Sequence, residues 1–311
     1  MKRRTYGPVP SRRFGLSLGI DVVPYKYCSL DCVYCQLGKT THRTITREAF
    51  FPVDQVLRDI EWSLKKKRRP DVLTFAGSGE PTLYSQLGEL IRKIREITDI
   101  PIVLLTNGTL LWDEEVVKDV SQCDVVAPSL DAGDEETFVR LNRPAQGLDF
   151  NRFVQGLIDF RKAFNGTLRL EVFLVAGIND SEDALHKIAR WIPQIRPDHV
   201  DINTAVRPVP GGINLKVSDH VLVMAQQIFG PASQVIASFR SNNIEFSEGK
   251  LTTQEVLESI QRRPQTLMDL ALSLGAHPQE VLKHLAELSA QQKIRPMLQG
   301  KETYWTAESE G

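Results

Sequence analysis

Short apolar segments alternate with amphipathic segments from residue 14 to residue 229 of this 311-residue chain. The apolar segments are typical of buried parallel strands, and each is followed by apolar residues at helical spacing. The expected strands cover residues 14–23, 71–77, 100–108, 123–132, 168–177 and 198–204, and the expected helices cover 53–69, 87–97, 113–120, 134–141, 150–164, 182–192 and 219–229. This alternation predicts an α/β fold with a parallel sheet and about six β/α repeats, fewer than the eight of a closed barrel.

The last part of the chain has a different pattern. From about residue 251 three short helical patterns follow one another at 252–264, 266–275 and 277–293, and residues 293–306 are typical of a hairpin. Helix, tight turn, helix and hairpin together indicate a small α+β winged helix-turn-helix domain. We therefore predict two domains, a partial barrel at 1–240 and the winged helix-turn-helix domain at 248–311, joined by polar linker segments.

Composition and charge narrow the functional classes. The formal net charge is −1, so the chain as a whole has no electrostatic bias toward nucleic acid or an anionic membrane. No apolar run approaches the roughly 18 residues of a membrane span. A twin-arginine export signal at Arg12 and Arg13 is disfavoured because Asp21 and Pro24 interrupt the apolar stretch that should follow. Four cysteines without a pairing pattern favour a reducing compartment, so we expect a cytoplasmic protein.

Three cysteines lie within eight positions, at Cys28, Cys32 and Cys35, directly after the first expected strand. A [4Fe–4S] cluster normally takes four cysteines, so three would leave one iron with an open coordination position. An open position on a metal is where chemistry takes place. The alternative is a structural zinc ion, which needs a fourth ligand and could take it only from His42 or Cys123.

Glycines and polar residues follow the expected strands at their carboxyl ends, where barrel enzymes bind ligands. The second strand runs into "AGSGEPTL" at 76–83, whose glycines would let the backbone approach a ligand closely. Each residue at the later strand ends has a plainer alternative as a turn, capping, core or ion-pair residue. The residues concerned are Asn107 after the third strand, Ser129 and Asp131 after the fourth, Ile178 after the fifth, and Asn203 and Arg207 after the sixth.

The spacing Cys-x3-Cys-x2-Cys, with Tyr34 just before the last cysteine, resembles the signature of the radical S-adenosylmethionine (radical SAM) superfamily. The resemblance implies a partial (β/α)6 barrel and two cofactors, a [4Fe–4S] cluster and S-adenosylmethionine. In that superfamily the amino and carboxylate groups of S-adenosylmethionine chelate the fourth iron. An electron from the cluster then yields a 5′-deoxyadenosyl radical, which abstracts a hydrogen from the substrate.

The same resemblance assigns the candidate site residues. Residues 77–80 resemble the family's GGE-type motif, whose backbone contacts the S-adenosylmethionine amino group, with Ser78 in place of the commoner second glycine. Ser129 would contact the ribose or carboxylate, and Ile178 would pack on the adenine. No residue is assigned a catalytic role. The metal ligands are Cys28, Cys32 and Cys35, and the cofactor-binding set is Tyr34, Gly77, Ser78, Gly79, Glu80, Asn107, Ser129, Asp131 and Ile178.

Several segments between residues 6 and 210 resemble the branch that contains the tRNA wyosine-base (4-demethylwyosine) synthases. Those enzymes condense pyruvate with N-methylguanosine in tRNA, using additional N-terminal cysteines for a second cluster. The first 27 residues here contain no cysteine, so the wyosine reaction is not transferred. Arg12, Arg13 and Arg143 could meet an anionic substrate, or could form ion pairs that hold the barrel mouth.

The C-terminal domain is the best indication of the substrate. Residues 248–311 carry seven Lys/Arg against nine Asp/Glu, which is not the basic stripe of a nucleic-acid reader. Winged helices also bind proteins, so RNA (tRNA) and protein or peptide modification are left as equal alternatives, with dimerisation as a third. The expected electron donor is a low-potential protein such as ferredoxin or flavodoxin. Other functions left open are a glycyl-radical-type activase and a metal- or redox-sensing helix-turn-helix regulator.

Overall fold

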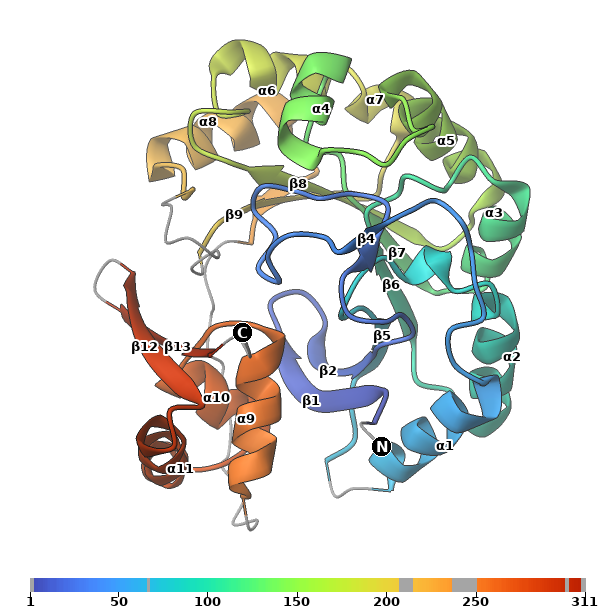
Figure 1. Ribbon diagram of the computed structural model, residues 1–311. Coiled ribbons are helices and arrows are strands. Elements are labelled where there is room, and N and C mark those ends of the chain that lie inside the picture. Colours follow the sequence, from blue (N-terminus) through green and yellow to red (C-terminus); the bar gives the residue numbers. More distant parts are fainter. Residues whose placement is uncertain (1–2, 66–67, 207–214, 237–250, 300–301, 309–311) are drawn as a thin grey trace.

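A computed structural model describes residues 3–65, 68–206, 215–236, 251–299 and 302–308. A curved sheet with helices around its outer side forms the larger body, and the C-terminal elements lie beside its first strand (Figure 1). The sheet has the order β1-β2-β5-β6-β7-β8-β9-β10, in which β1 is antiparallel to β2 and the other neighbours are parallel. The strands are β1 (Thr5–Ser11), β2 (Gly15–Ile20), β5 (Val72–Phe75), β6 (Ile102–Thr106), β7 (Val125–Pro128), β8 (Thr167–Leu174), β9 (His199–Thr204) and β10 (Ser233–Val235).

The α/β architecture with a parallel sheet is confirmed, and the six predicted strands correspond to β2 and β5 to β9. The helices are α1 (Val53–Leu64), α2 (Leu87–Ile97), α3 (Glu114–Val120), α4 (Glu135–Asn142), α5 (Phe150–Ala163), α6 (Glu182–Ala189), α7 (Ile192–Ile195) and α8 (Asp219–Phe229). The predicted helix at 182–192 is wrong at its end, because the chain forms α6 and then a separate α7 with Pro193 in its first turn. Proline has no backbone N–H and is best accommodated where a helix begins.

Two sheet strands, β1 and β10, were not indicated by the sequence pattern. β1 contains Gly7, Pro8 and Pro10, which are typical of loops but are tolerated in an edge strand. β10 has only three residues, too few for any periodicity. The end strands of a sheet therefore escape prediction for a physical reason, since they need neither the apolar run nor the full hydrogen-bonding capacity of a central strand.

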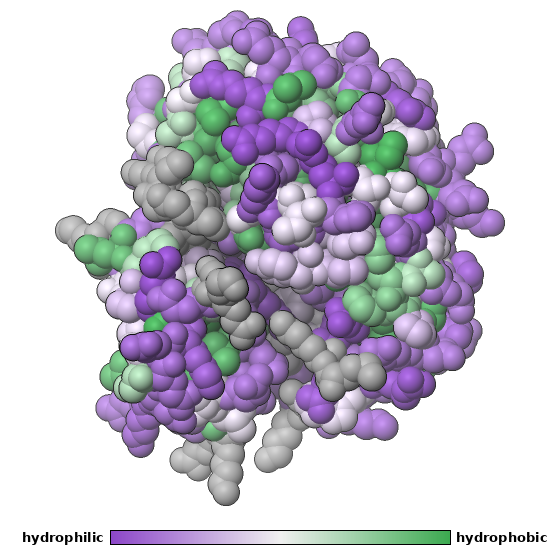
Figure 2. Space-filling view, viewed as in Figure 1, coloured by the Kyte–Doolittle hydropathy of each residue, from purple (hydrophilic) through white to green (hydrophobic). Residues whose placement is uncertain are grey.

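The core lies between the sheet and its helices. All four residues of β5 are buried, as expected for a parallel strand covered on both faces. α2 buries Leu87, Leu90, Ile91 and Ile94 against the sheet, and each of these side chains is fully inaccessible. Hydrophilic side chains cover most of the face seen in Figure 2. Within the described ranges, no helix has the length and apolar character that crossing a membrane requires.

An ion-pair cluster joins the β1–β2 turn to β8 and β9. Arg13 Nη1 lies 2.6 Å from Glu171 Oε2 and 3.3 Å from Asp201 Oδ2, and Arg169 binds both oxygens of Asp201 at 2.9 and 2.7 Å. Arg12 Nη1 donates to Asn203 Oδ1 at 3.0 Å. These contacts favour the ion-pair alternative for Arg13 over a substrate contact, and they bind Arg12 to a neutral amide.

We expect Asp201→Asn to lower the free energy of unfolding by about 3 kcal/mol near neutral pH, because it leaves the largely buried Arg169 without its carboxylate and leaves Arg13 with Glu171 alone. Burial alone would raise the pKa of Asp201, but hydrogen bonds from Arg169 and Gln234 and the charge of Arg13 outweigh it and hold the pKa below its usual value. A depressed folded-state pKa stabilises the fold above the unfolded-state pKa, and that contribution is lost as pH falls through the folded-state pKa.

Urea unfolding of both proteins between pH 7 and about pH 3 tests this prediction. The difference between wild type and Asp201→Asn should shrink toward the acid end, and a difference that stays constant with pH would contradict it. Asp99→Asn is the matched control, because Asp99 pairs with Arg69 on the surface and its side chain is 88% exposed. That control should change stability little.

The described C-terminal residues form three helices and a three-stranded antiparallel sheet of order β11-β13-β12. Val256, Ile260, Leu270, Val281 and Leu285 are buried in a separate apolar core. The linker predicted between the two domains lies outside the described residues, as does Gly300 within the hairpin predicted at 293–306. The elements are α9 (Thr253–Arg262), β11 (Gln265–Thr266), α10 (Leu267–Leu274), α11 (Pro278–Ala290), β12 (Ile294–Gln299) and β13 (Glu302–Ala307).

These C-terminal elements pack against the larger body at two places. α10 lies against β1 (Figure 1). The Arg262 guanidinium lies 4.4 Å from the centre of the Tyr6 ring. Tyr304 donates its hydroxyl hydrogen to the carbonyl of Val206, just after β9, at 2.9 Å. The contact covers the edge strand β1, which would otherwise be open to pairing with another chain.

Candidate functional site

The three clustered cysteines lie on a loop that the end of α4 (Glu135–Asn142) holds in place. Cys28 ends β3 (Tyr27–Cys28), which pairs with the short β4 (His42–Arg43). The backbone N–H groups of Asp31 and Val33 donate to the carbonyls of Asn142 (2.9 Å) and Leu141 (3.0 Å), at the end of α4. The cysteine loop is therefore anchored by main-chain hydrogen bonds to a helix terminus, whose last carbonyls have no partner within the helix.

Each cysteine sulfur receives one side-chain N–H from elsewhere in the chain. Asn107 Nδ2 lies 3.6 Å from Cys28 Sγ, and Asn142 Nδ2 lies 3.4 Å from Cys32 Sγ. Lys26 Nζ lies 3.3 Å from Cys35 Sγ. None of the three donors follows from the cysteine motif itself.

The thiols suit a bound metal cluster. Burial raises the pKa of Cys28 to about 12 and, together with the neighbouring Cys28 thiol and Asp131, raises the pKa of Cys32 well above its usual value. A coordinated metal deprotonates such a thiol outright, so a cation is the ligand that would make these half-buried sulfurs anionic. The residues present therefore fit a cluster bound through three thiolates.

A single zinc ion fits less well. Over the part of the chain that the structure describes, no group of three or more His, Cys, Asp or Glu residues is placed to hold one metal ion. Tetrahedral zinc would bring its thiolates to within about 4 Å of one another, whereas a four-iron cluster is larger. Neither proposed fourth ligand is suitable. Cys123 is buried at the amino end of β7, opposite the strand ends that precede the site loops, and the exposed His42 stacks on Tyr27 at 4.1 Å.

The loop at 77–80 is held tightly against the start of the cysteine loop. Ser78 donates its backbone N–H and its hydroxyl to the two oxygens of Asp21, at 3.0 and 2.5 Å. A Cβ on Gly79 would lie 1.7 Å from the carbonyl oxygen of Tyr27, so only glycine fits there. Asp21 was not predicted as a site residue, although an acidic residue directly after the first strand was a usable signal.

The Glu80 carboxylate accepts hydrogen bonds from other residues of the protein. The Glu80 side chain is only 2% exposed, and its carboxylate accepts hydrogen bonds from Thr82, from the Thr106 hydroxyl (2.6 Å) and from the Asn107 backbone N–H (2.7 Å). Burial raises the pKa of Glu80, while these hydrogen bonds oppose the rise. The carboxylate links the ends of β5 and β6 and orients Asn107, so any contact of this motif with a ligand would come from its backbone.

Asp131 and Tyr34 form a buried pair. The Asp131 carboxylate accepts from the Tyr34 hydroxyl, from Asn142 Nδ2 at 3.1 Å and from the backbone N–H of Phe173 at 2.9 Å. Burial raises the pKa of Asp131 to about 6. The Tyr34 ring stacks on Phe173 at 4.1 Å. Both oxygens of Asp131 accept from protein donors and the carboxylate positions Tyr34, while a contact of Asp131 with a cofactor stays a prediction.

Ser129 and Ile178 are the predicted residues with side chains least committed to other contacts. The backbone N–H of Ser129 donates to Thr106 at 3.2 Å, and no hydrogen bond to its half-buried hydroxyl occurs among the described residues. Ile178 is half-buried and packs, like Tyr34, on a small apolar cluster. That cluster consists of Leu141, Phe173, Val175, Ala205 and Leu215.

The other predicted rim residues lie apart from this group. Arg143 adopts a left-handed conformation (φ 48°) at the end of α4, and its side chain is half-exposed, 3.8 Å from Asp31. Asn203 accepts the hydrogen bond from Arg12 described above. Arg207 lies outside the described residues. The contacts of Arg143 and Asn203 do not favour a role for either residue in ligand binding.

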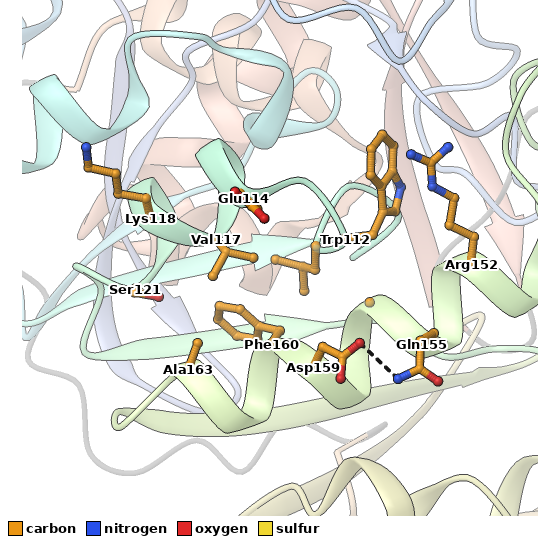
Figure 3. Close-up of a pocket in the computed structure, with 12 residues that line it drawn as sticks. Trp112, Glu114, Val117, Lys118, Ser121, Arg152, Gln155, Asp159, Phe160 and Ala163 are labelled. Atoms are coloured by element: carbon orange, nitrogen blue, oxygen red, sulfur yellow. Dashed lines mark hydrogen bonds between the residues drawn. The ribbon is translucent and has the colours of Figure 1, made fainter.

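A separate groove of about 650 Å³ lies between α3 and α5 on the outer helical layer (Figure 3). Its floor includes Val117 and Phe160, and at its edge the Arg152 guanidinium lies 3.3 Å from the centre of a Trp112 ring. None of its lining residues belongs to the predicted site. The groove is therefore distinct from the cysteine site.

Comparison with known proteins identifies the class. Residues 22–192 match the model of the Radical SAM superfamily, and the chain belongs to that superfamily. Its members are enzymes that bind a [4Fe–4S] cluster and S-adenosylmethionine. The chain shares its fold, at 18% identity and a TM-score of 0.53, with a radical SAM methyltransferase from Sphaerobacter thermophilus, over 70% of this chain and 65% of that one.

Two curated relatives are similar over nearly the whole chain. A UPF0026 protein of Helicobacter pylori (strain ATCC 700392 / 26695) is 34% identical over 295 residues, which cover 93% of this chain and 92% of that protein. A protein of Brachyspira hyodysenteriae named GTPase Obg is 37% identical over 295 residues, or 94% of this chain. The chain spans only 43% of that relative's length.

Proposed function

We propose that this chain binds a [4Fe–4S] cluster through Cys28, Cys32 and Cys35 and cleaves S-adenosylmethionine reductively to modify a macromolecule. The observation that carries the proposal is the set of three half-buried thiols, each with its own N–H donor. When bound, the cluster supplies the electron that splits the sulfonium and generates the 5′-deoxyadenosyl radical, which abstracts hydrogen from the substrate.

The chain's own residues would bind and orient S-adenosylmethionine beside the cysteines. The backbone of residues 77–79, clamped by Asp21, offers peptide groups for the amino group of the ligand. The Ser129 hydroxyl would bind its ribose or carboxylate, and Ile178 and Tyr34 would form the apolar wall for the adenine. Glu80 and Asp131 hold these elements in position.

The C-terminal elements would recognise the substrate as a winged helix-turn-helix module. The exposed face of α11 carries Leu282 (51% exposed) together with Lys283 and Glu287. This mixture, and the acidic balance of residues 248–311, favours a protein or peptide substrate. RNA is the second candidate, because the sequence resembles the wyosine branch, whose members act on tRNA. The electron would come from a low-potential donor such as ferredoxin or flavodoxin.

Anaerobic reconstitution with iron and sulfide, followed by dithionite and S-adenosylmethionine, tests the chemistry. We expect a brown protein that releases 5′-deoxyadenosine. A colourless protein holding one zinc ion would contradict the proposal. A redox-sensing regulator would take up iron without releasing 5′-deoxyadenosine.

The substrate class is tested by comparing peptide and RNA nucleoside mass profiles of cells with and without the protein. Cells that carry the Cys28→Ala form serve as the control for effects unrelated to the chemistry. A change confined to peptides supports the favoured substrate, and a change confined to nucleosides supports RNA. A stable radical on a glycine of another protein, seen by electron paramagnetic resonance, would instead indicate an activase.

A further inference from the structure

Lys26 is a buried cation that faces the cysteine loop. Lys26 is only 2% exposed, and its backbone adopts a left-handed conformation with φ 62°. The ammonium donates to Cys35 Sγ at 3.3 Å and to the carbonyl of Gly38. Among the described residues, no carboxylate lies within ion-pair distance of Lys26 Nζ. A buried charge without a counter-ion is unfavourable, so this site calls for an anionic group beside it.

We propose that Lys26, together with Asn107 and Asn142, sets the reduction potential of the cluster, with Lys26 making the largest contribution. The inference rests on the proposed function, because it assumes that the three cysteines hold a [4Fe–4S] cluster. A cluster with three thiolate ligands carries negative charge, and gaining an electron makes it more negative. A nearby ammonium stabilises the reduced state more than the oxidised state, and so raises the potential.

The two amides act in the same direction but without a full charge. Asn142 is held by a second hydrogen bond, from its Nδ2 to Asp131 at 3.1 Å. Asn107 is held on both sides, since Nδ2 donates to Ser29 at 2.8 Å and Oδ1 accepts from the Thr109 hydroxyl at 2.8 Å. These partners keep the N–H groups of both amides directed at the sulfurs. Hydrogen bonds to cluster sulfurs raise the potential, and neutral donors do so less than a charged one.

The test is the midpoint potential of the reconstituted cluster, measured by anaerobic redox titration with electron paramagnetic resonance. We expect Lys26→Met to shift the potential to more negative values, and Asn142→Leu to shift it in the same direction by less. Lys26→Arg, which keeps the charge, should restore a potential near that of wild type. Lys39→Met is the matched control, because Lys39 is exposed on the same loop and should leave the potential unchanged.

Iron and sulfide content is measured on wild type and on every variant. It distinguishes a variant that fails to bind the cluster from one that binds the cluster with an unchanged potential. A loaded Lys26→Met protein with the wild-type potential would overturn the inference and leave the proposed function intact. If Lys26→Met does not take up iron, Asn142→Leu decides in its place, and an unchanged potential there would overturn the inference. A wild-type protein that takes up no cluster would contradict the proposed function itself.

Discussion

Cys28→Ala, Cys32→Ala and Cys35→Ala are each expected to abolish release of 5′-deoxyadenosine and to lower the iron content after reconstitution. Each thiolate is one of three protein ligands, and losing one leaves two irons of the cluster without a protein ligand. Another cysteine cannot substitute, because Cys123 is 5% exposed at the amino end of β7, away from the loop. Iron and sulfide analysis, with product measurement by chromatography, checks the prediction.

Cys123→Ala is the control for this series. The substitution removes a thiol of the same kind from the apolar core and should cost about 1 kcal/mol of stability. Iron content and product formation should match those of wild type. A Cys28→Ala protein that still releases 5′-deoxyadenosine at the wild-type rate would refute the assignment of the ligands.

Gly79→Ala is expected to cost about 3 kcal/mol of stability and to weaken S-adenosylmethionine binding by about tenfold or more. The added Cβ would meet the carbonyl oxygen of Tyr27 at 1.7 Å and the carbonyl carbon at 2.7 Å. Both atoms are backbone, so the conflict is relieved only by moving residues 77–80 away from Cys28. Titration calorimetry on the reconstituted protein and urea unfolding measure the two effects.

Gly230→Ala provides the matched control for Gly79→Ala. Gly230 ends α8 at φ +87°, and nothing lies within 4 Å of the position of an added Cβ. That substitution should cost about 2 kcal/mol through backbone strain alone, because φ +87° with ψ −172° is a conformation that residues other than glycine rarely adopt. It should leave S-adenosylmethionine binding unchanged. Equal effects of the two substitutions on binding would show that the close contact of Gly79 with Tyr27 has no role in the site.

The central strands and the helices could be predicted because their signals are local. The apolar run of β5 and the buried face of α2 are visible in a few consecutive residues. β1 could not be predicted, because Pro8 and Pro10 are compatible with a strand only at the edge of a sheet. The position of β1 at that edge is a property of the whole sheet.

The sequence predicted where the candidate site lies, but it did not predict which side chains contact one another there. Parallel strands bring their carboxyl ends to one edge of the sheet, so residues 77–80, Asn107 and Ser129 could be grouped from strand positions alone. The direction of a side chain depends on its neighbours in space. Glu80 and Asp131 therefore accept hydrogen bonds from donors within the protein that the strand positions did not reveal.

The sequence by itself determined that three thiols stand together without a fourth, because ligand number and spacing are properties of consecutive residues. Only the tertiary structure decided what surrounds the sulfurs. Asn142 is 110 residues from Cys32 and Asn107 is 79 residues from Cys28, yet each donates to its sulfur. These asparagines and cysteines meet because the sheet brings loops that are distant in the sequence to one edge. The periodicity of the sequence does not indicate which side chains meet at that edge.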